Sequence, residues 1–300
     1  MVDFVELSNK RTKSVRTIEE LLLEFVPQTF KLLKPNQQVS SEEISSESYM
    51  TPSGETLLGA RRPIPILSMK VTTKIGTWNV RTMYETCKAA QVANEMRRYN
   101  IAVLGICESR WNGADRITLA RGEQLVYSGD ENEQHAHTEG VAFMMRKLAA
   151  TALIEWVPVS PRIITAPFNS KGRKITLINC YAPTNNTTDE LKQEFYDSLQ
   201  DVLDHTPRHD SRILMGDLNA KIGSNNTVRE TIMGPHGLGC LNENGERFAD
   251  LCPVNDLVIG GSIFPHKTIH NATWISPDGR SSKQIDHITI AESGGGALYM

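Results

Sequence analysis

The amino-acid sequence predicts a layered α/β fold in which strands and helices pack around one core. From Lys74 onward, short strand-like apolar runs alternate with longer amphipathic stretches, the order of elements expected of stacked sheets and helices. The chain has 300 residues with 39% apolar composition, which is enough to bury one large core. We therefore expect one large domain with an appendage rather than two equal domains.

Nine strand-like runs and three helical patterns make up this domain. The strands are expected at residues 74–80, 101–109, 124–129, 140–146, 174–183, 212–222, 257–261, 272–276 and 284–290. Helices are expected at 85–98, 188–204 and 243–252, where apolar side chains share one face. Pro253 is expected to end the third helix, because proline interrupts helical hydrogen bonding.

Residues 1–70 differ in texture from the rest of the chain. One short helical pattern at 17–33 is followed by a segment rich in Ser, Glu and Pro with few large apolar residues. Such a segment buries too little apolar surface to offset the entropy lost on ordering. We expect a flexible leader with one short helix at 1–70, followed by the main domain at 74–290.

Composition limits the location and the partners of the protein. The formal net charge is -3, so charge alone neither supports nor excludes a nucleic acid, because a bound cation can supply positive charge. The five cysteines contain no CxxC pair, which favours reduced structural thiols. Without a signal peptide or a membrane-spanning apolar stretch, we expect a nuclear or cytoplasmic protein that is not secreted. No obligate protein partner is evident.

Polar residues stand at the ends of several predicted strands. They are Asn79, Glu108 and Tyr181, together with Asp217 and Asn219 after the apolar run ILMG. Each alone has a structural interpretation, such as a turn former, a solvated strand end or an edge aromatic. Acidic and amide groups gathered at one end of a sheet instead indicate a hydrolytic site.

Phosphodiester hydrolysis needs the groups that these residues could supply. It requires a carboxylate for a hard cation, a group that activates water, and donors to the charge developing on the phosphate. Glu108 could hold Mg²⁺ and Asp217 could activate water. Asn79, Tyr181 and Asn219 could contact phosphate oxygens.

An ordered series of motifs carries a family resemblance. They are TWNVRT (77–82), GICESRW (105–111), NCYAPT (179–184), GDLNAKIG (216–223) and QIDHI (284–288). This series resembles the exonuclease III and apurinic endonuclease branch of the endonuclease/exonuclease/phosphatase superfamily. The resemblance implies a four-layered α/β sandwich of two mixed β-sheets flanked by helices, with the active site at one end.

The resemblance also implies a role for each site residue. Asn79 matches the active-site asparagine, Glu108 the metal-binding glutamate and Tyr181 the tyrosine that contacts phosphate. Asp217 and Asn219 match the pair that positions the nucleophilic water and stabilises the transition state. A further residue, in QIDHI, resembles the aspartate that orients the catalytic histidine; this is Asp286.

Finer details resemble one branch of the superfamily. GTWNVRT, ESRW and the run at 255–274 are similar to endonucleases of non-LTR retrotransposons and to craniofacial development protein 2-like host proteins. The resemblance implies Mg²⁺, with Mn²⁺ as an alternative, and double-stranded DNA that is nicked. No reverse transcriptase segment is present in this sequence.

Two features depart from the family pattern. After Ile290 the sequence reads AESGGGALYM, a tail at 291–300 outside the family pattern, where relatives continue to a Ser-Asp-His motif on a further core strand. We therefore expect a sandwich without its last core strand, with its activity in question. His287 is a poor substitute for the histidine of this motif, because it points away from the face of Asp286.

The second departure is Arg81, which replaces an acidic residue of some relatives. It either contacts DNA phosphate or is a solvated strand-end arginine.

Three hypotheses for the function follow. The first is a Mg²⁺-dependent DNA endonuclease of retrotransposon type, inactive if the missing histidine is essential. The second is a non-catalytic remnant or interaction protein, supported by the lost motif. The third, less favoured by the retrotransposon-like details, is a phosphatase of the same fold that acts on a small molecule or a lipid headgroup.

Overall fold

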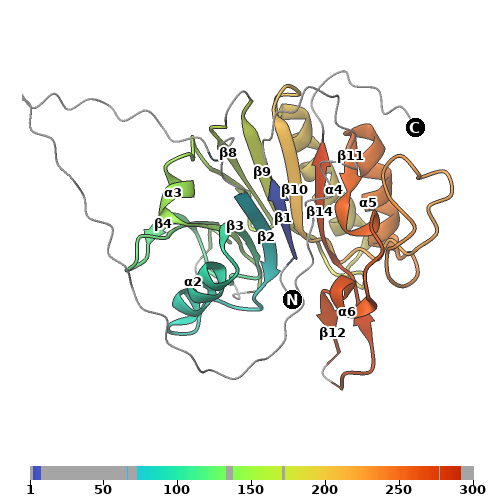
Figure 1. The fold of residues 1–300 in the computed structure, drawn as a ribbon, viewed down its shortest axis with the longest axis horizontal. Helices are drawn as coiled ribbons and strands as arrows, with labels where there is room; N and C mark the ends of the chain where they lie inside the picture. Colours follow the sequence, from blue (N-terminus) through green and yellow to red (C-terminus); the bar gives the residue numbers. More distant parts are fainter. Residues whose placement is uncertain are drawn as a thin grey trace, which may run out of the picture.

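Two six-stranded β-sheets lie at the centre of the molecule, as the computed structural model in Figure 1 shows. The structure describes residues 3–7, 66, 73–132, 138–170, 173–276 and 278–291. The first sheet contains β1 (Asp3–Leu7), β2 (Thr73–Asn79), β3 (Ile101–Cys107), β4 (Ala114–Thr118), β5 (Gln124–Ser128) and β6 (Val141–Met145). The second contains β7 (Val157–Ser160), β8 (Ile163–Phe168), β9 (Ile175–Tyr181), β10 (Ser211–Asp217), β11 (Leu257–Ile259) and β14 (Asp286–Ala291).

Helices and one small hairpin complete the described elements. The helices are α2 (Lys88–Arg98), α3 (Lys147–Ala150), α4 (Asp189–His205), α5 (Glu243–Val254) and α6 (Thr268–Asn271), with a 3-10 turn η1 (Gly260–Ser262). The hairpin is β12 (Trp274–Ile275) with β13 (Ser282–Lys283). No helix in the described ranges is both long enough and apolar enough to cross a bilayer.

Both large sheets are mixed. The strand order is β1-β2-β3-β6-β5-β4 in the first and β11-β14-β10-β9-β8-β7 in the second. The parallel pairs are β2 with β3 and β9 with β10, and the remaining pairs are antiparallel. Parallel pairing brings the carboxyl ends of two strands to the same edge of a sheet, which decides where the residues that follow them lie.

Three apolar cores separate four layers. The inner core lies between the sheets and includes Ile75, Val103, Leu177, Ile213 and Met215. One outer core packs α2 on the first sheet through Val92, Met96, Leu104 and Ile106. The other packs α4 and α5 on the second sheet through Ile178, Leu199, Leu214 and Phe248. This helix–sheet–sheet–helix order, visible in Figure 1, confirms the predicted four-layered sandwich.

Strand alternation decides which strand-end residues face the space between the sheets. On β10, Ile213 and Met215 belong to the inner core, whereas Leu214 belongs to the core under the helices. Because successive side chains point to opposite faces, Asp217 is directed toward the space between the sheets, at the end of β10. The same alternation applies to Asn79, Tyr181 and Asp286 on their strands.

The predicted elements are present with shifted ends. Each of the nine predicted runs contains a strand, and each of the three helical patterns contains a helix. Strands β1, β4, β7, β8 and β13 were missed. The residues of β4 are all exposed, so they lack the alternation that identifies a strand, and β8 contains Pro167, which disfavours a strand by its sequence.

Two predictions need correction, and two others fall outside the described residues. Pro253 does not end α5, which runs one residue further, to Val254. The predicted flexible leader contains a strand at 3–7, β1, which pairs antiparallel with β2 and covers backbone groups at its edge. The helix predicted at 17–33 lies outside the described residues, as does the predicted tail beyond Ala291. The expected absence of a last core strand therefore stays a prediction.

Candidate active site at one end of the sandwich

Three of the sequence-predicted site residues form a row across the second sheet. Asp217 at the end of β10 is the register partner of Tyr181 on β9 and of Asp286 on β14. These residues are far apart in the chain, but pairing of their strands places them side by side. The row lies at the edge of the sheet where β9 and β10 both end.

Asn79 connects this row to the first sheet. Its Nδ2 donates to Glu108 Oε1 at 2.7 Å and to Asp217 Oδ2 at 2.8 Å. Glu108 follows β3 of the first sheet, whereas Asp217 ends β10 of the second. One amide group therefore holds two carboxylates together, one from each sheet.

Two hydrogen bonds of Asn219 fix the loop after Asp217, one from its backbone and one from its side chain. The backbone N–H of Asn219 donates to Asp217 Oδ1 at 2.9 Å, and its Nδ2 donates to the carbonyl of Ala182 at 3.0 Å. Ala182 directly follows Tyr181, and its own N–H donates to the carbonyl of Asp217 at 2.8 Å. The loops after β9 and β10 are thus tied to each other.

Backbone strain gathers in the loops of this site. Glu108 has φ 55° and Asn219 has φ 48°, both in the left-handed region. Arg81 and Arg110, each two residues from a site residue, have φ 63° and 59°. Non-glycine residues in such conformations cost about 1–3 kcal/mol each and are enriched at functional sites. This strain is an independent indication of function that no sequence pattern revealed.

Burial raises the pKa of the Asp217 carboxyl. Asp217 is 3% exposed, and this burial, reinforced by the charge of Glu108, raises its pKa to about 6. Hydrogen bonds from Asn79 and from the backbone of Asn219 oppose the shift. An aspartate with such a pKa is close to the range in which a carboxylate works as a general base near neutral pH.

Tyr181 and Cys107 stay protonated beside these carboxylates. Burial and the charges of Glu108 and Asp217 raise the pKa of Tyr181, so its hydroxyl remains a hydrogen-bond donor. Burial raises the pKa of Cys107, whose sulfur accepts from the backbone N–H of Asp217 at 3.3 Å. The hydroxyl of Tyr181 can donate to an anionic ligand. The sulfur of Cys107 holds the backbone at Asp217 by accepting its N–H.

Three arginines lie beside the site, each next to a different site residue. The backbone N–H of Arg81 donates to Asn79 Oδ1 at 2.9 Å. The guanidinium of Arg110 pairs with Glu108 Oε2 at 3.3 Å. Arg162 donates to the carbonyl of Tyr181 at 3.0 Å and lies over its ring, 5.1 Å from the centroid.

His287 faces away from this site, as the sequence analysis expected. Its Nε2 donates to the carbonyl of Ala220 at 2.7 Å, and its ring lies 5.3 Å from that of Phe248 on α5. Burial lowers its pKa to about 4, so it is neutral at physiological pH. It serves as a neutral packing residue under α5.

Comparison with known proteins agrees with the geometry. The model of the Endonuclease/Exonuclease/phosphatase family matches residues 76–290, which include every residue of the site described above. The chain belongs to this family. Its fold is shared with the AP endonuclease LMAP from Leishmania major, which superposes with a TM-score of 0.52 at 15% identity and covers 73% of this chain and 79% of that chain.

Two curated relatives confirm the resemblance found in the sequence. The chain is 38% identical over 214 residues to craniofacial development protein 2 from Bos taurus, covering 71% of this chain and 35% of the relative. The protein of the same name from Tragulus javanicus is also 38% identical over 214 residues, covering 71% and 36%. The chain therefore spans about a third of the length of the curated relatives it matches.

The donor set fits the divalent cation that the family resemblance implies. Glu108 and Asp217 are held together by Asn79, and the side chain of Glu108 is 16% exposed. Among the residues that the structure describes, no three His, Cys, Asp or Glu side chains group as a complete metal cage. Mg²⁺ commonly takes only one or two carboxylates and fills its remaining positions with water and substrate phosphate. The two carboxylates suit that mode of binding.

The structure also identifies site neighbours that the sequence analysis missed. Arg162 contacts Tyr181, while Asn242 and Asn244, around the start of α5, contact the site loops. An asparagine just before a helical pattern is a helix-capping signal, which could have identified Asn242. Nothing in the local sequence indicates Arg162, because its partner belongs to the next strand of the sheet.

Proposed function

We propose that this chain is a Mg²⁺-dependent phosphodiester hydrolase that nicks double-stranded DNA. The observation that carries the proposal is the Asn79 amide, which joins Glu108 and Asp217 from two different sheets. This arrangement brings Glu108, a carboxylate of the kind that binds hard cations, next to Asp217, a buried carboxylate with a raised pKa. Hydrolysis of a phosphodiester bond needs both a bound cation and a group that activates water.

Each site residue has a role in this proposal. Glu108 holds Mg²⁺, which when bound supplies positive charge at the scissile phosphate. Asp217 orients a water molecule and accepts its proton, and Asn79 keeps the two carboxylates in register. Tyr181 and Asn219 donate to phosphate oxygens, where charge develops in the transition state.

Asp286 has a supporting role in the proposed site. It is buried, and it is the register partner of Asp217 on the neighbouring strand. From this position it can orient a residue that approaches the phosphate from the side of β14.

Mn²⁺ also prefers oxygen ligands, so we expect it to support the proposed reaction in place of Mg²⁺.

The arginines favour an extended polyanion over a small phosphate ester. Arg81, Arg110 and Arg162 belong to three different loops beside the site. The guanidinium of Arg110 pairs with Glu108, and that of Arg162 pairs with Glu139. A single phosphate needs fewer positive groups, whereas a nucleic-acid backbone presents phosphates on both sides of the bond that is cut. The formal charge of the whole chain is -3, so these arginines are a local feature.

The retrotransposon type of the proposed endonuclease is supported by the sequence. The motifs GTWNVRT and ESRW resemble those of endonucleases encoded by non-LTR retrotransposons. The chain is also 38% identical over 214 residues to craniofacial development protein 2. We therefore propose DNA, rather than an inositol phosphate or a lipid headgroup, as the substrate.

A plasmid-nicking assay tests the proposal. The full chain and a version extended by a Ser-Asp-His strand are incubated with supercoiled plasmid and Mg²⁺. We expect nicking that falls about 10²–10⁴-fold in Glu108→Ala and in Asp217→Ala, because each removes a group that acts on the reacting phosphate or water. Chelation of Mg²⁺ should abolish the activity.

Matched controls make the result interpretable. Glu194→Ala removes an exposed carboxylate from α4 and should leave nicking unchanged. Absence of nicking in both the native and the extended chain would overturn the proposal and favour a non-catalytic role. Faster hydrolysis of inositol phosphates than of DNA would replace the endonuclease with a phosphatase.

A further inference from the structure

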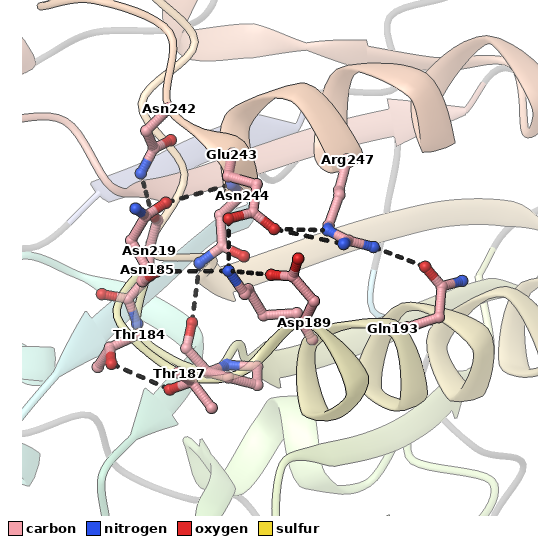
Figure 2. A network of polar contacts seen from close by, with 12 residues as sticks. Thr184, Asn185, Thr187, Asp189, Gln193, Asn219, Asn242, Glu243, Asn244 and Arg247 are labelled. Carbon is pink, nitrogen blue, oxygen red and sulfur yellow. Dashed lines mark hydrogen bonds and ion pairs between the residues drawn. The ribbon is translucent and has the colours of Figure 1, made fainter.

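The start of α5 contacts both loops that carry the site. Figure 2 shows Asn242 next to Asn219, and Asn244 above the loop that contains Thr184 and Asn185. The sequence here is Asn-Glu-Asn-Gly, at positions 242–245. They contact one proposed site residue, Asn219, through its backbone carbonyl, and the proposed mechanism gives them no role of their own.

Three hydrogen bonds of Asn242 link α5 to the loop after β10, and another from its side chain caps the helix. Its Oδ1 accepts from the backbone N–H of Gly245 at 2.9 Å, which caps the helix, and from that of Lys221 at 2.7 Å. Its Nδ2 donates to the carbonyl of Asn219 at 3.0 Å. Its backbone N–H donates to the carbonyl of Lys221 at 3.1 Å. The oxygen thus serves the helix and the loop, whereas the amide nitrogen serves the loop alone.

Asn244 does the same for the loop after β9. Its Nδ2 donates to the carbonyl of Pro183 at 2.8 Å, and its backbone N–H donates to Asn185 Oδ1 at 3.4 Å. The side chain is fully buried. At Gly245 any added Cβ would lie 2.0 Å from the carbonyl oxygen of Lys221, so the helix approaches the loop as closely as its backbone allows.

A buried lysine fixes the start of α5 against α4. Lys192 on α4 is 2% exposed and pairs with Glu243 of α5 and with Asp189 of its own helix. Its Nζ also donates to the carbonyl of Asn185 at 3.4 Å. Arg247 pairs with Glu243 from the other side, as Figure 2 shows. Because α5 is held in this way, a side chain at its start can act as a fixed support for the loops.

We propose that Asn242 is a positioning residue that sets the site loop through the carbonyl of Asn219. Asn219 is strained, with φ 48°, and its backbone N–H donates to Asp217 Oδ1. A strained residue keeps its conformation only when its surroundings hold it from several sides. The amide nitrogen of Asn242 supplies one of these constraints, so its loss changes the position of Asn219 relative to Asp217. This inference rests on the proposed phosphodiesterase function of the same site.

The Asn242→Asp variant separates positioning from helix capping. Aspartate retains the oxygen that accepts from Gly245 and Lys221, and it caps helices as well as asparagine does. It loses the donor to Asn219 and puts a second acceptor against that carbonyl. Asn242→Ala removes both functions. A residue that serves only as a cap should therefore tolerate aspartate and not alanine.

Two measurements on the full chain test the inference. For Asn242→Asp we expect a thermal midpoint close to that of the wild type, an unchanged KM for DNA, and a kcat about 10-fold lower, as for the loss of roughly one hydrogen bond. Hydrogen exchange by mass spectrometry should show faster exchange at residues 217–221 and unchanged exchange in α5. Asn225→Asp, which keeps an exposed acceptor to the N–H of Thr227, is the matched control and should change neither result.

The two measurements fail in distinguishable ways. Unchanged kcat and unchanged loop exchange in Asn242→Asp would show that Asn242 is a cap alone and would overturn the inference. Equal losses of stability in Asn242→Asp and Asn242→Ala would overturn it as well. If neither the wild-type chain nor the version extended by a Ser-Asp-His strand cleaves DNA, the proposed function fails, and the exchange measurement still decides whether Asn242 holds the loop.

Discussion

At the scale of one residue, Asp217 shows that a group of the proposed site can lower the stability of the fold. Its carboxyl is buried between the ends of the two sheets, and its pKa is raised from 3.8 to about 6. The folded state therefore binds the proton more tightly than the unfolded state does. The stability from this proton is present below about pH 4 and is lost as the pH rises through about 6. Above that range the charged carboxylate destabilises the fold.

Asp217→Asn should consequently stabilise the protein while abolishing its proposed activity. In buffer without divalent cations at pH 8, we expect the free energy of unfolding to rise by on the order of 1–3 kcal/mol, because a buried charge is removed. At pH 5 the gain should be small, since the native carboxyl is then mostly protonated. Urea unfolding at both pH values measures the difference.

The exposed residue Asp201 on α4 provides the control. Asp201→Asn should leave the unfolding free energy unchanged at both pH values, because its charge is solvated in either state. A gain for Asp217→Asn of equal size at pH 5 and pH 8 would contradict the argument from the raised pKa. It would mean that the substitution acts through packing or hydrogen bonding.

At the scale of secondary-structure elements, the parallel pair β9–β10 builds the row of site residues. The pair leaves no room for a side chain at Gly216, directly before Asp217. Gly216 has φ 139°, and an added Cβ would lie 1.9 Å from the carbonyl oxygen of Cys180 on β9. Close backbone contact between the two strands and the positive φ both favour glycine at this position.

Gly216→Ala should disrupt this pair of strands. We expect a loss of more than about 3 kcal/mol in the free energy of unfolding, because the backbone of β9 or β10 must move to accept the methyl group. Gly113→Ala is the matched control, with φ 72° and no heavy atom within 4 Å of its added Cβ. That variant should lose only about 1–2 kcal/mol, from backbone strain alone. Similar losses in both variants would contradict the close contact.

At the scale of the whole molecule, buried amides join the two sheets at more than one level. Asn79 joins them at the site, and Asn179 joins them inside the core. Asn179 on β9 is fully buried, and its Nδ2 donates to the carbonyls of Ile106 at 2.8 Å and Ala142 at 3.3 Å in the opposite sheet. These hydrogen bonds fix the position of one sheet relative to the other. Apolar contacts alone set this position less specifically.

Asn179→Ala should weaken the contact between the sheets. Loss of the amide leaves buried carbonyls without this donor, so we expect the free energy of unfolding to fall by about 2–3 kcal/mol. The proposed nicking activity should fall as well, since the site needs groups from both sheets. Asn94→Ala, at an exposed position of α2, is the control and should change the unfolding free energy by less than about 0.5 kcal/mol. A similarly small effect of Asn179→Ala would show that the sheets do not depend on this bridge.

The sequence by itself determined the family, the nine predicted strand regions and the three helix regions. It also indicated the six residues that the structure gathers at one end of the sandwich: Asn79, Glu108, Tyr181, Asp217, Asn219 and Asp286. These features are local, because apolar periodicity and motif residues can be recognised within short windows of the chain.

The tertiary structure alone decided how these residues meet. Asn79 and Asp217 are 138 positions apart, and their hydrogen bond depends on the packing of two sheets. The same holds for Arg162 beside Tyr181 and for Asn242 beside Asn219. The physical reason is that the partner of each group is chosen by sheet pairing and layer packing, which bring together residues that no local pattern relates.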